Sequence, residues 1–187
     1  MPKKLRKTYQ LKIGLKGSQP PIWRRFLIEN SATLRKLHEA IQIIMGWEDY
    51  HLHQYISGDR YYGAPDPAYG FSEVLDEKNY GISQLLKNEK ESIIYEYDFG
   101  DSWEHKITLE KILPFDPDAD LPICIKAKGA CPPEDIGGIW GYYNFLEALS
   151  DENHPEHEDY DEWIEGGFDP AAYDIKEVNS VLSKYFR

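Results

Sequence analysis

Two stretches of the chain alternate strictly between apolar and polar side chains, and this alternation constrains the fold more than any other feature. In residues 9–15, every second side chain is Tyr, Leu or Ile, with Gln, Lys or Gly between them. Residues 93–109 show the same alternation twice, on either side of an Asp-Phe-Gly-Asp-Ser turn. A period of two is typical of a β-strand with one face in the core and one in water. The sequence therefore predicts a sheet, with a hairpin over 93–109.

A second hairpin and a helix are expected near the start of the chain. After a Gly-Ser-Gln-Pro-Pro break, residues 22–29 alternate again. Ser31 or Thr33 offers an N-cap for a helix whose apolar side chains recur at helical spacing until Gly46 ends it. The other expected elements are, in chain order, a strand over 51–57, a loop through Phe71, a helical turn at 82–86, a strand over 121–127, and three helices around Tyr142, Trp163 and Val178.

This order of elements predicts an α+β fold with a mixed or antiparallel sheet. We expect a single domain over 1–187, with a sheet core at about 8–128 and a helical C-terminal part at about 138–187. A hairpin followed by a packed helix also indicates a β-grasp (ubiquitin-like) core. The chain has 187 residues, of which 41% are hydrophobic, so it can bury a core without metal or disulfide support.

No apolar run is long enough for a membrane helix or a secretory signal, so we expect a cytoplasmic protein with no membrane contact. In that compartment Cys124 and Cys131 are expected to be reduced thiols.

Charge is unevenly distributed along the chain, whose formal net charge is −12. Residues 1–50 hold 10 basic and 4 acidic side chains, whereas the rest holds 11 and 29. Phosphate is bound mainly by Lys and Arg, so only the basic first quarter is a candidate nucleic-acid surface. Within it, Trp23, Arg24 and Arg25 are candidates to stack on and clamp an anion.

Two segments combine side chains that bind metal ions or transfer protons. His51 and His53 lie two residues apart on a predicted strand, so both rings are expected on one face. Asp98, Asp101 and His105 belong to the 93–109 hairpin, where an Asp–His pair can orient a base or hold a cation. Turn formation and hydrogen bonds within the sheet are the structural alternatives for these side chains.

A third such segment is the stiff, proline-containing loop over 131–138. Its Cys131 and Glu134 offer a soft and a hard metal ligand, or a nucleophile and a base. Alternatively, Glu134 and Asp135 simply stabilise the N-terminus of the next helix. The sequence contains no Gly-x-Ser-x-Gly, His-Glu-x-x-His, Walker or Gly-x-Gly-x-x-Gly motif, so hydrolases of the nucleophile-elbow type, zincin proteases and nucleotide-binding ATPases lose support.

Taken together, these motifs resemble those of the plasmid pRiA4b ORF-3-like family over nearly the whole chain. The resemblance rests on Ile22-Trp23-Arg24-Arg25, Leu37-His38, Gly46-Trp47, His51-Leu52-His53, Tyr97-Asp98-Phe99-Gly100-Asp101, Trp103, His105, Cys131-Pro132-Pro133-Glu134-Asp135, Gly137-Gly138, His154-Pro155-Glu156-His157 and Phe168-Asp169-Pro170. The resemblance implies a single α+β domain with a β-grasp-like sheet. It also implies an uncharacterised family of bacteria and archaea, associated with plasmids and mobile elements, in which some members are labelled as transposon resolvases.

Three functions follow as hypotheses. The first is a non-enzymatic binding domain with a protein partner, because no complete catalytic motif is present. The second is a metal-dependent hydrolase or nuclease. Its candidate catalytic residues are Asp98, Asp101, His105 and Glu134, and its candidate ligands for a divalent metal are His51, His53, Asp101, His105 and Cys131. The third is a DNA-binding accessory protein that uses the basic N-terminal quarter.

Overall fold

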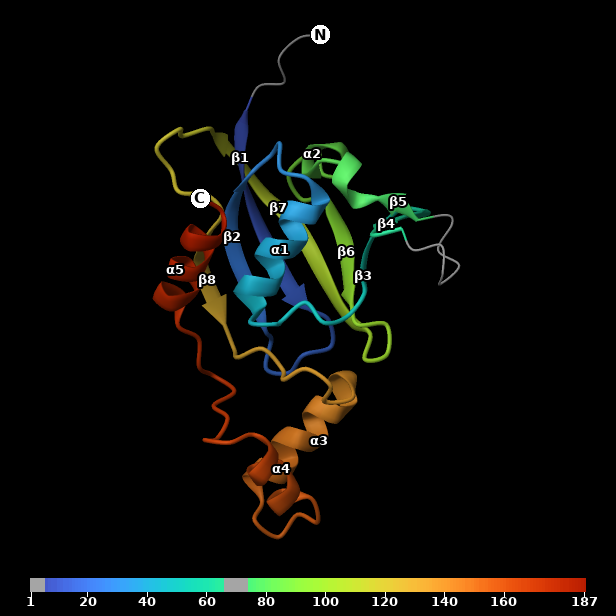
Figure 1. Ribbon diagram of the computed structural model, residues 1–187, viewed down its shortest axis with the longest axis vertical. Coiled ribbons are helices and arrows are strands. Elements are labelled where there is room, and N and C mark those ends of the chain that lie inside the picture. Colours follow the sequence, from blue (N-terminus) through green and yellow to red (C-terminus); the bar gives the residue numbers. More distant parts are fainter. Residues whose placement is uncertain (1–5, 66–73) are drawn as a thin grey trace.

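A computed structural model describes residues 6–65 and 74–187, which form one eight-stranded sheet with helices (Figure 1). The strands are β1 (Lys7–Leu15), β2 (Trp23–Glu29), β3 (His53–Ser57), β4 (Arg60–Gly63), β5 (Leu75–Asp76), β6 (Ser92–Tyr97), β7 (Trp103–Pro114) and β8 (Ile123–Lys128). The helices are α1 (Leu34–Met45), α2 (Ile82–Leu85), α3 (Gly138–Ser150), α4 (His157–Trp163) and α5 (Ile175–Tyr185), with a 3-10 turn at Glu77–Asn79. The predicted α+β class is confirmed.

The strands lie in the order β5-β4-β3-β6-β7-β1-β2-β8. Strands β4 and β5 pair in parallel, and every other neighbouring pair is antiparallel. The predicted mixed sheet is therefore confirmed. Both predicted hairpins are present, as β1–β2 and β6–β7, and α1 directly follows the first of them.

Burial alternates along the first hairpin as the sequence predicts. On one face, Leu11 and Phe26 are fully buried. Arg24 lies on the same face and is also fully buried, which no hydrophobic pattern would suggest. Its Nε donates to the carbonyl of Ile44 at 3.0 Å, and its guanidinium lies 4.1 Å from the ring centre of Tyr173. Because Ile44 is in the last turn of α1, the negative end of that helix stabilises the buried charge.

Helix α1 lies across one face of the sheet (Figure 1) and has a defined start and end. Thr33, rather than Ser31, is its N-cap and accepts a hydrogen bond from the backbone N–H of Lys36 at 3.1 Å. Gly46 ends it with a φ of 95°, a left-handed conformation that suits glycine. Helix α5 packs beside α1 and β8, with Asp174 as its N-cap.

The segment after α1 differs from the prediction in two ways. Strand β3 begins at His53, so His51 lies in the turn before it and not on the strand. Strand β4 occupies part of the segment expected as a loop, because a turn at Gly58 returns the chain alongside β3. The remainder of the expected loop, through Phe71, lies in residues 66–73, outside the described residues.

Helices α3 and α4 lie together beyond one end of the sheet, next to the turn between β6 and β7 (Figure 1). Their apolar contact is built on Phe145, whose ring meets Tyr160 at 5.3 Å and Phe168 at 5.2 Å between centroids. No helix within the described residues is long and apolar enough to cross a lipid bilayer.

Candidate functional site

Three loops meet at the end of the sheet that faces α3. They are residues 46–52 between α1 and β3, residues 98–102 between β6 and β7, and residues 129–137 between β8 and α3. The second and third are joined by a hydrogen bond from the N–H of Gly137 to Asp101 Oδ2 at 3.1 Å. The fold therefore brings together the three motifs that are separate in the sequence.

His51, from the first loop, lies between carboxylates from the other two. Its Nδ1 is 3.6 Å from Asp98 Oδ2, and its Nε2 is 3.2 Å from Asp135 Oδ1. The Nε2 atom is buried from solvent but makes no hydrogen bond. One nitrogen of His51 and one oxygen from each aspartate lie within 4.8 Å of one another, which is a spacing that a metal ion can bridge.

The backbone at both aspartates is in an uncommon conformation. Asp98 has a φ of 57° and Asp135 a φ of 59°, in the left-handed region that few residues other than glycine adopt. Asp98 Oδ1 accepts the N–H of Gly100 at 2.9 Å, which closes a turn and leaves Oδ2 as the oxygen nearer to His51. The turn thus holds Oδ1 of Asp98 in a hydrogen bond with the backbone and leaves Oδ2 3.6 Å from His51.

Glu134 connects the loops and is already engaged. Its Oε1 accepts a hydrogen bond from the hydroxyl of Tyr97, and its Oε2 accepts the N–H of Glu48 at 3.1 Å. Burial, and then this hydrogen bond, raise the pKa of Tyr97 well above its usual value, so its hydroxyl remains a donor. Trp47 stacks on Tyr97 at 4.8 Å and donates to the carbonyl of Pro132 at 3.1 Å. These contacts hold the positions of the loops.

Asp101 has a positioning role. Beyond its bond to Gly137, its backbone carbonyl lies so close to Gly138 that a Cβ there would be 2.5 Å from the oxygen. Gly138 also has a φ of 69°, so the close approach and the left-handed backbone both require glycine. The paired glycines of the third motif thereby bring the start of α3 onto the turn that carries Asp98.

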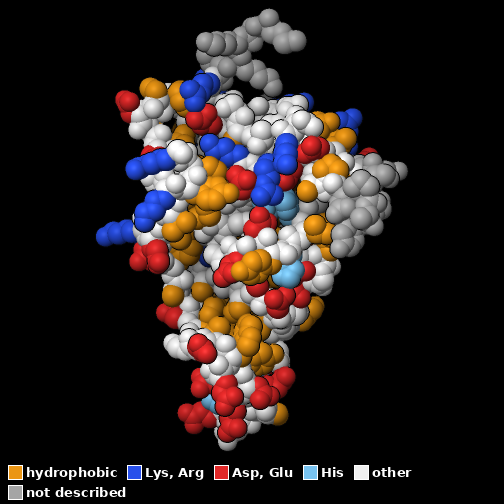
Figure 2. Space-filling view, in the orientation of Figure 1, with side chains coloured by type: hydrophobic (Ala, Val, Ile, Leu, Met, Phe, Trp, Pro, Cys, Tyr) orange, Lys and Arg blue, Asp and Glu red, His pale blue; other side chains and the backbone are white. Residues whose placement is uncertain are grey.

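An open pocket of about 460 Å³ lies beside His51. It is lined by Arg35, Asp49, Tyr50, His51, Leu52, His53 and Ala64. Figure 2 shows histidine side chains near the middle of the face in view, among basic, acidic and apolar side chains. A ligand in this pocket would contact His51 directly.

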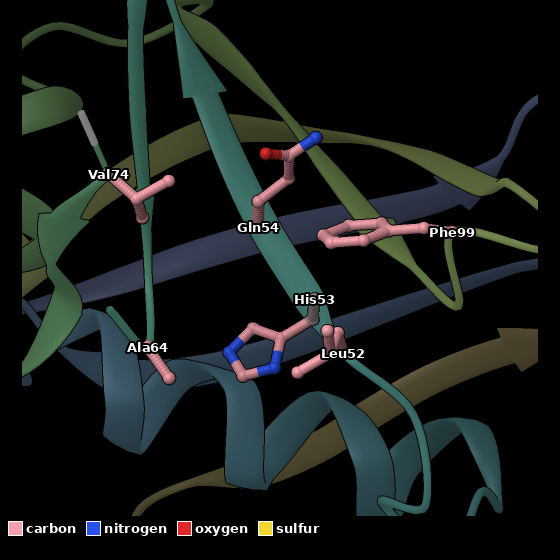
Figure 3. Close-up of a pocket in the computed structure, with 6 residues that line it drawn as sticks. All are labelled: Leu52, His53, Gln54, Ala64, Val74 and Phe99. Atoms are coloured by element: carbon pink, nitrogen blue, oxygen red, sulfur yellow. The ribbon is translucent and has the colours of Figure 1, made fainter. Parts of the chain in front are cut away.

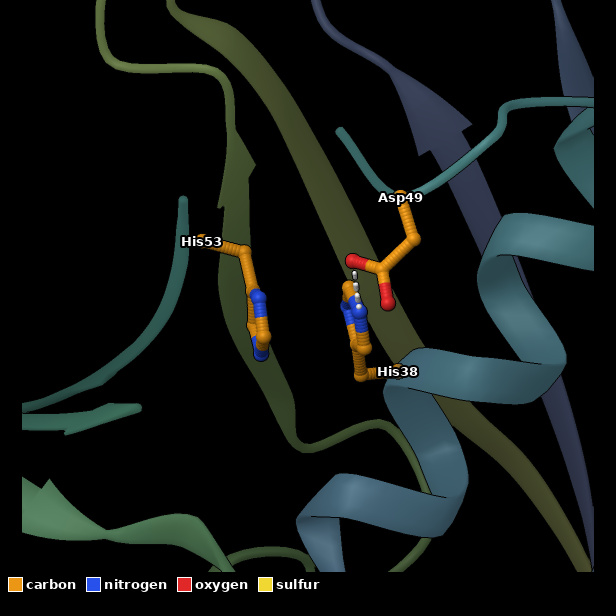
Figure 4. A group of neighbouring side chains, drawn as sticks. All are labelled: His38, Asp49 and His53. Carbon is orange, nitrogen blue, oxygen red and sulfur yellow. Dashed lines mark hydrogen bonds and ion pairs between the residues drawn. The ribbon is translucent and has the colours of Figure 1, made fainter. Parts of the chain in front are cut away.

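A second histidine cluster lies at the wall of the pocket (Figure 4). His38 and His53 stack with ring centroids 3.4 Å apart and planes within 6°. His38 Nε2 is 2.7 Å from Asp49 Oδ1, and His53 Nε2 is 2.7 Å from the fully buried Glu77. His38 Nδ1 is also 2.8 Å from the hydroxyl of Tyr95. Burial lowers the pKa of His38 despite the hydrogen bond with Asp49, so this ring is neutral near pH 7.

His38, Asp49 and His53 also offer three potential ligand atoms within 4.8 Å, but the ring geometry argues against one shared ion. Imidazole lone pairs lie in the ring plane, so two parallel rings cannot both direct a nitrogen at the same metal. Both nitrogens of His38 are moreover already in hydrogen bonds. His53 also borders a small cavity of about 10 Å³, beside Phe99 and Val74 (Figure 3), with room for one water molecule.

His105 and Cys131, two predicted metal ligands, are in other environments. His105 is fully buried, with Nδ1 2.9 Å from the carbonyl of Trp103, and burial lowers its pKa to about 4. Its ring meets the edge of Trp47 at 5.3 Å. Desolvation raises the pKa of the Cys131 thiol, which disfavours the thiolate that metal binding and nucleophilic attack require.

The three predicted anion-binding residues lie on β2 and already have partners. Arg24 donates to the backbone carbonyls of Ile44, Trp23 and Lys128, each at 3.0 Å. Arg25 Nη2 donates to Glu110 at 2.8 Å, and the ion pair raises the pKa of Arg25. Trp23 is covered by Lys12, whose Nζ lies 5.0 Å from the ring centre.

Sequence reasoning missed four residues of this region. His38 belongs to a motif of the family resemblance but otherwise appears only as a polar residue on the apolar face of the predicted helix. Asp49 comes first in the alternating series 49, 51 and 53, before the two histidines. Glu77 lies in a turn with no motif, and Asp135 was seen only as a helix-terminal charge. None of them has a spacing typical of a known metal site.

Comparison with known proteins identifies the family of this chain. The plasmid pRiA4b ORF-3-like protein family matches residues 7–177. The chain is 35% identical over 174 residues to the uncharacterized protein y4hQ of Sinorhizobium fredii (strain NBRC 101917 / NGR234), covering 92% of this chain and 89% of that protein.

Among solved structures, the fold is similar to the crystal structure of the protein of unknown function MM3350 from Methanosarcina mazei Go1. The TM-score is 0.84 at 40% identity, and the match covers 93% of this chain and 98% of that one. These relatives are uncharacterised, in agreement with the expectation from the motifs. On the family match and the similarity along most of its length, this chain belongs to the plasmid pRiA4b ORF-3-like family.

Proposed function

We propose that the chain binds a divalent transition-metal ion through His51, Asp98 and Asp135. The observation that carries the proposal is the Nε2 atom of His51, which is buried, makes no hydrogen bond, and lies 3.2 Å from a carboxylate oxygen. A buried polar atom without a partner is costly, and an ion at this position would satisfy it. One imidazole and two carboxylates are a donor set that suits Zn²⁺, Fe²⁺ or Mn²⁺.

The charge around the site supports a cation. The meeting loops carry six carboxylates and no Lys or Arg; the carboxylates belong to Glu48, Asp49, Asp98, Asp101, Glu134 and Asp135. His51 is the only basic side chain between them. A divalent ion would offset this excess of negative charge.

The present spacing needs only a small contraction to hold an ion. Ligand atoms about 2.1 Å from a metal lie at most about 4.2 Å from one another. The three ligand atoms lie within 4.8 Å of one another, and Asp135 is 73% exposed on a loop, so its carboxylate can adjust. Three protein ligands leave coordination positions open toward the pocket beside His51, as in catalytic metal sites.

The test is metal binding by the purified, metal-free protein. Titration with Zn²⁺ and Mn²⁺ by calorimetry, checked by elemental mass spectrometry, should give one ion per chain. We expect His51→Ala and Asp98→Asn to weaken binding by at least about 100-fold, since each removes a ligand. His154→Ala and Asp161→Asn, which are outside the site, are the matched controls. Equal binding by site and control variants would overturn the proposal.

An ion with open positions serves either a binding protein or a metal-dependent hydrolase or nuclease. The absence of a complete catalytic motif favours the first of these. Metal-dependent cleavage of a phosphodiester or ester probe, lost in His51→Ala, would instead support the enzyme. DNA binding through the basic N-terminal quarter stays a prediction, to be tested by the salt dependence of duplex binding.

Cellular location and domain organisation are also part of the proposal. We place the protein in the cytoplasm, supported by two free cysteines, Cys124 and Cys131. We treat 1–187 as one domain with a sheet core at about 8–128 and a helical part at about 138–187. A β-grasp relationship for its core is supported by the hairpin β1–β2 and helix α1 in succession.

A further inference from the structure

A second pocket lies between the loop before α3 and helix α4. It has a volume of about 380 Å³ and is lined by Asp135, Ile136, Glu156, Asp159, Tyr160 and Trp163. We name it the acidic–aromatic pocket. Its lining combines three carboxylates with two aromatic rings, and its size lies within the range of ligand-binding pockets.

The rings of Tyr160 and Trp163 both pack against Phe145. Phe145 meets the ring of Tyr160 at 5.3 Å and that of Trp163 at 6.0 Å, both edge-on at 81° and 89°. Trp163 nevertheless remains 48% exposed. A fixed ring that is open to the outside is available to stack on a ligand.

The segment of the chain that forms this pocket is acidic and carries no Lys or Arg. Residues 129–175 contain thirteen Asp and Glu and no Lys or Arg. Figure 2 shows acidic side chains gathered at this end of the molecule. Of the lining carboxylates, Glu156 accepts a hydrogen bond from the neutral Asn144 at 2.7 Å, and Asp135 faces His51. A positively charged ligand is therefore favoured over a neutral one, and anions are excluded.

We propose that the acidic–aromatic pocket binds the guanidinium group of an arginine side chain presented by a partner protein. A guanidinium is planar, stacks on aromatic rings, and donates to two carboxylates at once. The pocket opens at the surface beside the half-exposed Trp163, which suits a side chain that enters from a bound polypeptide. This inference does not require the proposed metal ion, because Glu156 and Asp159 supply two lining carboxylates besides Asp135, which is a proposed ligand of that ion.

The experiment uses a peptide probe, acetyl-Gly-Arg-Gly-Arg-Gly-amide, titrated into the full chain by calorimetry at low salt. Its matched ligand replaces both arginines with citrulline, which has nearly the same shape and no charge. We expect the arginine peptide to bind and the citrulline peptide to bind at least about tenfold more weakly, since charge-assisted hydrogen bonds are lost. Equal affinity for the two peptides, or no binding of either, would overturn the proposal.

Matched protein variants separate the pocket from diffuse acidity. Glu156→Gln with Asp159→Asn removes two charges that line the pocket, at the N-cap and in the first turn of α4. Glu158→Gln with Asp161→Asn removes two charges of α4 that do not line it. We expect about tenfold weaker binding in the first pair and less than about twofold in the second. Equal weakening in both would show that only net charge attracts the peptide, contrary to the proposal.

Two further measurements identify the source of the guanidinium group and distinguish the acidic–aromatic pocket from the proposed metal site. Free arginine should bind much more weakly than the peptide, and equal binding would contradict a protein source. The peptide titrations use metal-free protein in the presence of EDTA, so peptide binding is measured without the proposed ion. If the protein proves not to bind a metal ion, the peptide-binding result can therefore still be interpreted. Thermal unfolding of each variant confirms that it is folded.

Discussion

His38 and His53 stack face to face, with ring centroids 3.4 Å apart and planes within 6° of parallel. A carboxylate holds each ring at its Nε2, Asp49 for one and the buried Glu77 for the other. Two stacked imidazolium ions would repel each other, and burial already lowers the pKa of His38. The pair is therefore a fixed structural link between α1 and β3, next to the loop that carries His51.

This link makes Glu77 a key residue for stability. Glu77 is fully buried, bonds to His53 at 2.7 Å, and lies 3.7 Å from a guanidinium nitrogen of Arg35. Glu77→Ala would leave His53 and Arg35 without this partner, and we expect it to lower the free energy of unfolding by about 3 kcal/mol. Urea denaturation measures the change. Glu39→Ala, which removes a partly exposed partner of the same arginine, should cost less than about 1 kcal/mol.

Arg24 and Arg25 are neighbours with opposite expected sensitivities. The buried guanidinium of Arg24 bonds to three backbone carbonyls, those of Ile44, Trp23 and Lys128. An ammonium group cannot reproduce this fork, so Arg24→Lys should destabilise the fold by roughly 3 kcal/mol. Arg25→Lys keeps a partly exposed ion pair and should cost less than about 1 kcal/mol. Similar losses in both variants, measured by urea denaturation, would contradict this account of Arg24.

His105 should make stability depend on pH in the acid range. Burial lowers its pKa in the folded state to about 4, against about 6.5 when unfolded. Between about pH 4 and about pH 6.5 the unfolded state binds a proton at His105 that the folded state does not bind. The stability contributed by the neutral, buried His105 is therefore fully present above about pH 6.5 and is lost as the pH falls toward about 4. The loss amounts to about 3 kcal/mol.

The measurement is urea denaturation at several pH values for the wild type and for His105→Gln, which cannot titrate. Other groups change both curves equally, so the difference between the two slopes isolates His105. Parallel curves between pH 6.5 and 4 would mean that His105 is not desolvated in the folded state. His154→Gln, at a more exposed histidine, is the control for a simple change in histidine number.

The two cysteines should be unreactive in the folded protein. Burial raises the pKa of both the Cys124 and Cys131 thiols, so little thiolate exists at pH 8. We expect alkylation by iodoacetamide to be at least about tenfold slower than in urea, where both thiols are labelled. Mass spectrometry identifies the labelled residue. Rapid labelling of Cys131 in the folded protein would restore it as a candidate nucleophile or metal ligand.

Local pattern was enough to predict most secondary structure, because the responsible interactions lie close together in the chain. Alternation identified β1, β2, β6 and β7, and helical spacing with a Thr33 cap and Gly46 identified α1. Strand β4 was missed because it depends on pairing with β3, which no local pattern records. The start of β3 at His53 was likewise set by pairing with Tyr97 across the sheet.

The candidate site was predicted only in part. His51 and Asp98 were named from the sequence because their motifs carry metal-binding side chains, but Asp135 was read as a helix-terminal charge. His53 and His105 carry the same chemistry as His51, yet one bonds to Glu77 and the other is enclosed against Trp47. Residue type therefore identifies candidate ligands, whereas the neighbours that the fold supplies determine their roles.

The α+β class, the hairpins and the family could be predicted from the sequence alone, since these follow from short-range periodicity and from motifs in a fixed order. The folded arrangement of the sheet and its loops causes loops 46–52, 98–102 and 129–137 to meet, with Asp98 and Asp135 on either side of His51. It also decided that Glu77, far along the chain, lies beneath His53. Such contacts could not be predicted from the sequence, because they depend on sheet order and on backbone geometry at Asp98, Asp135 and Gly138, which are properties of the whole fold.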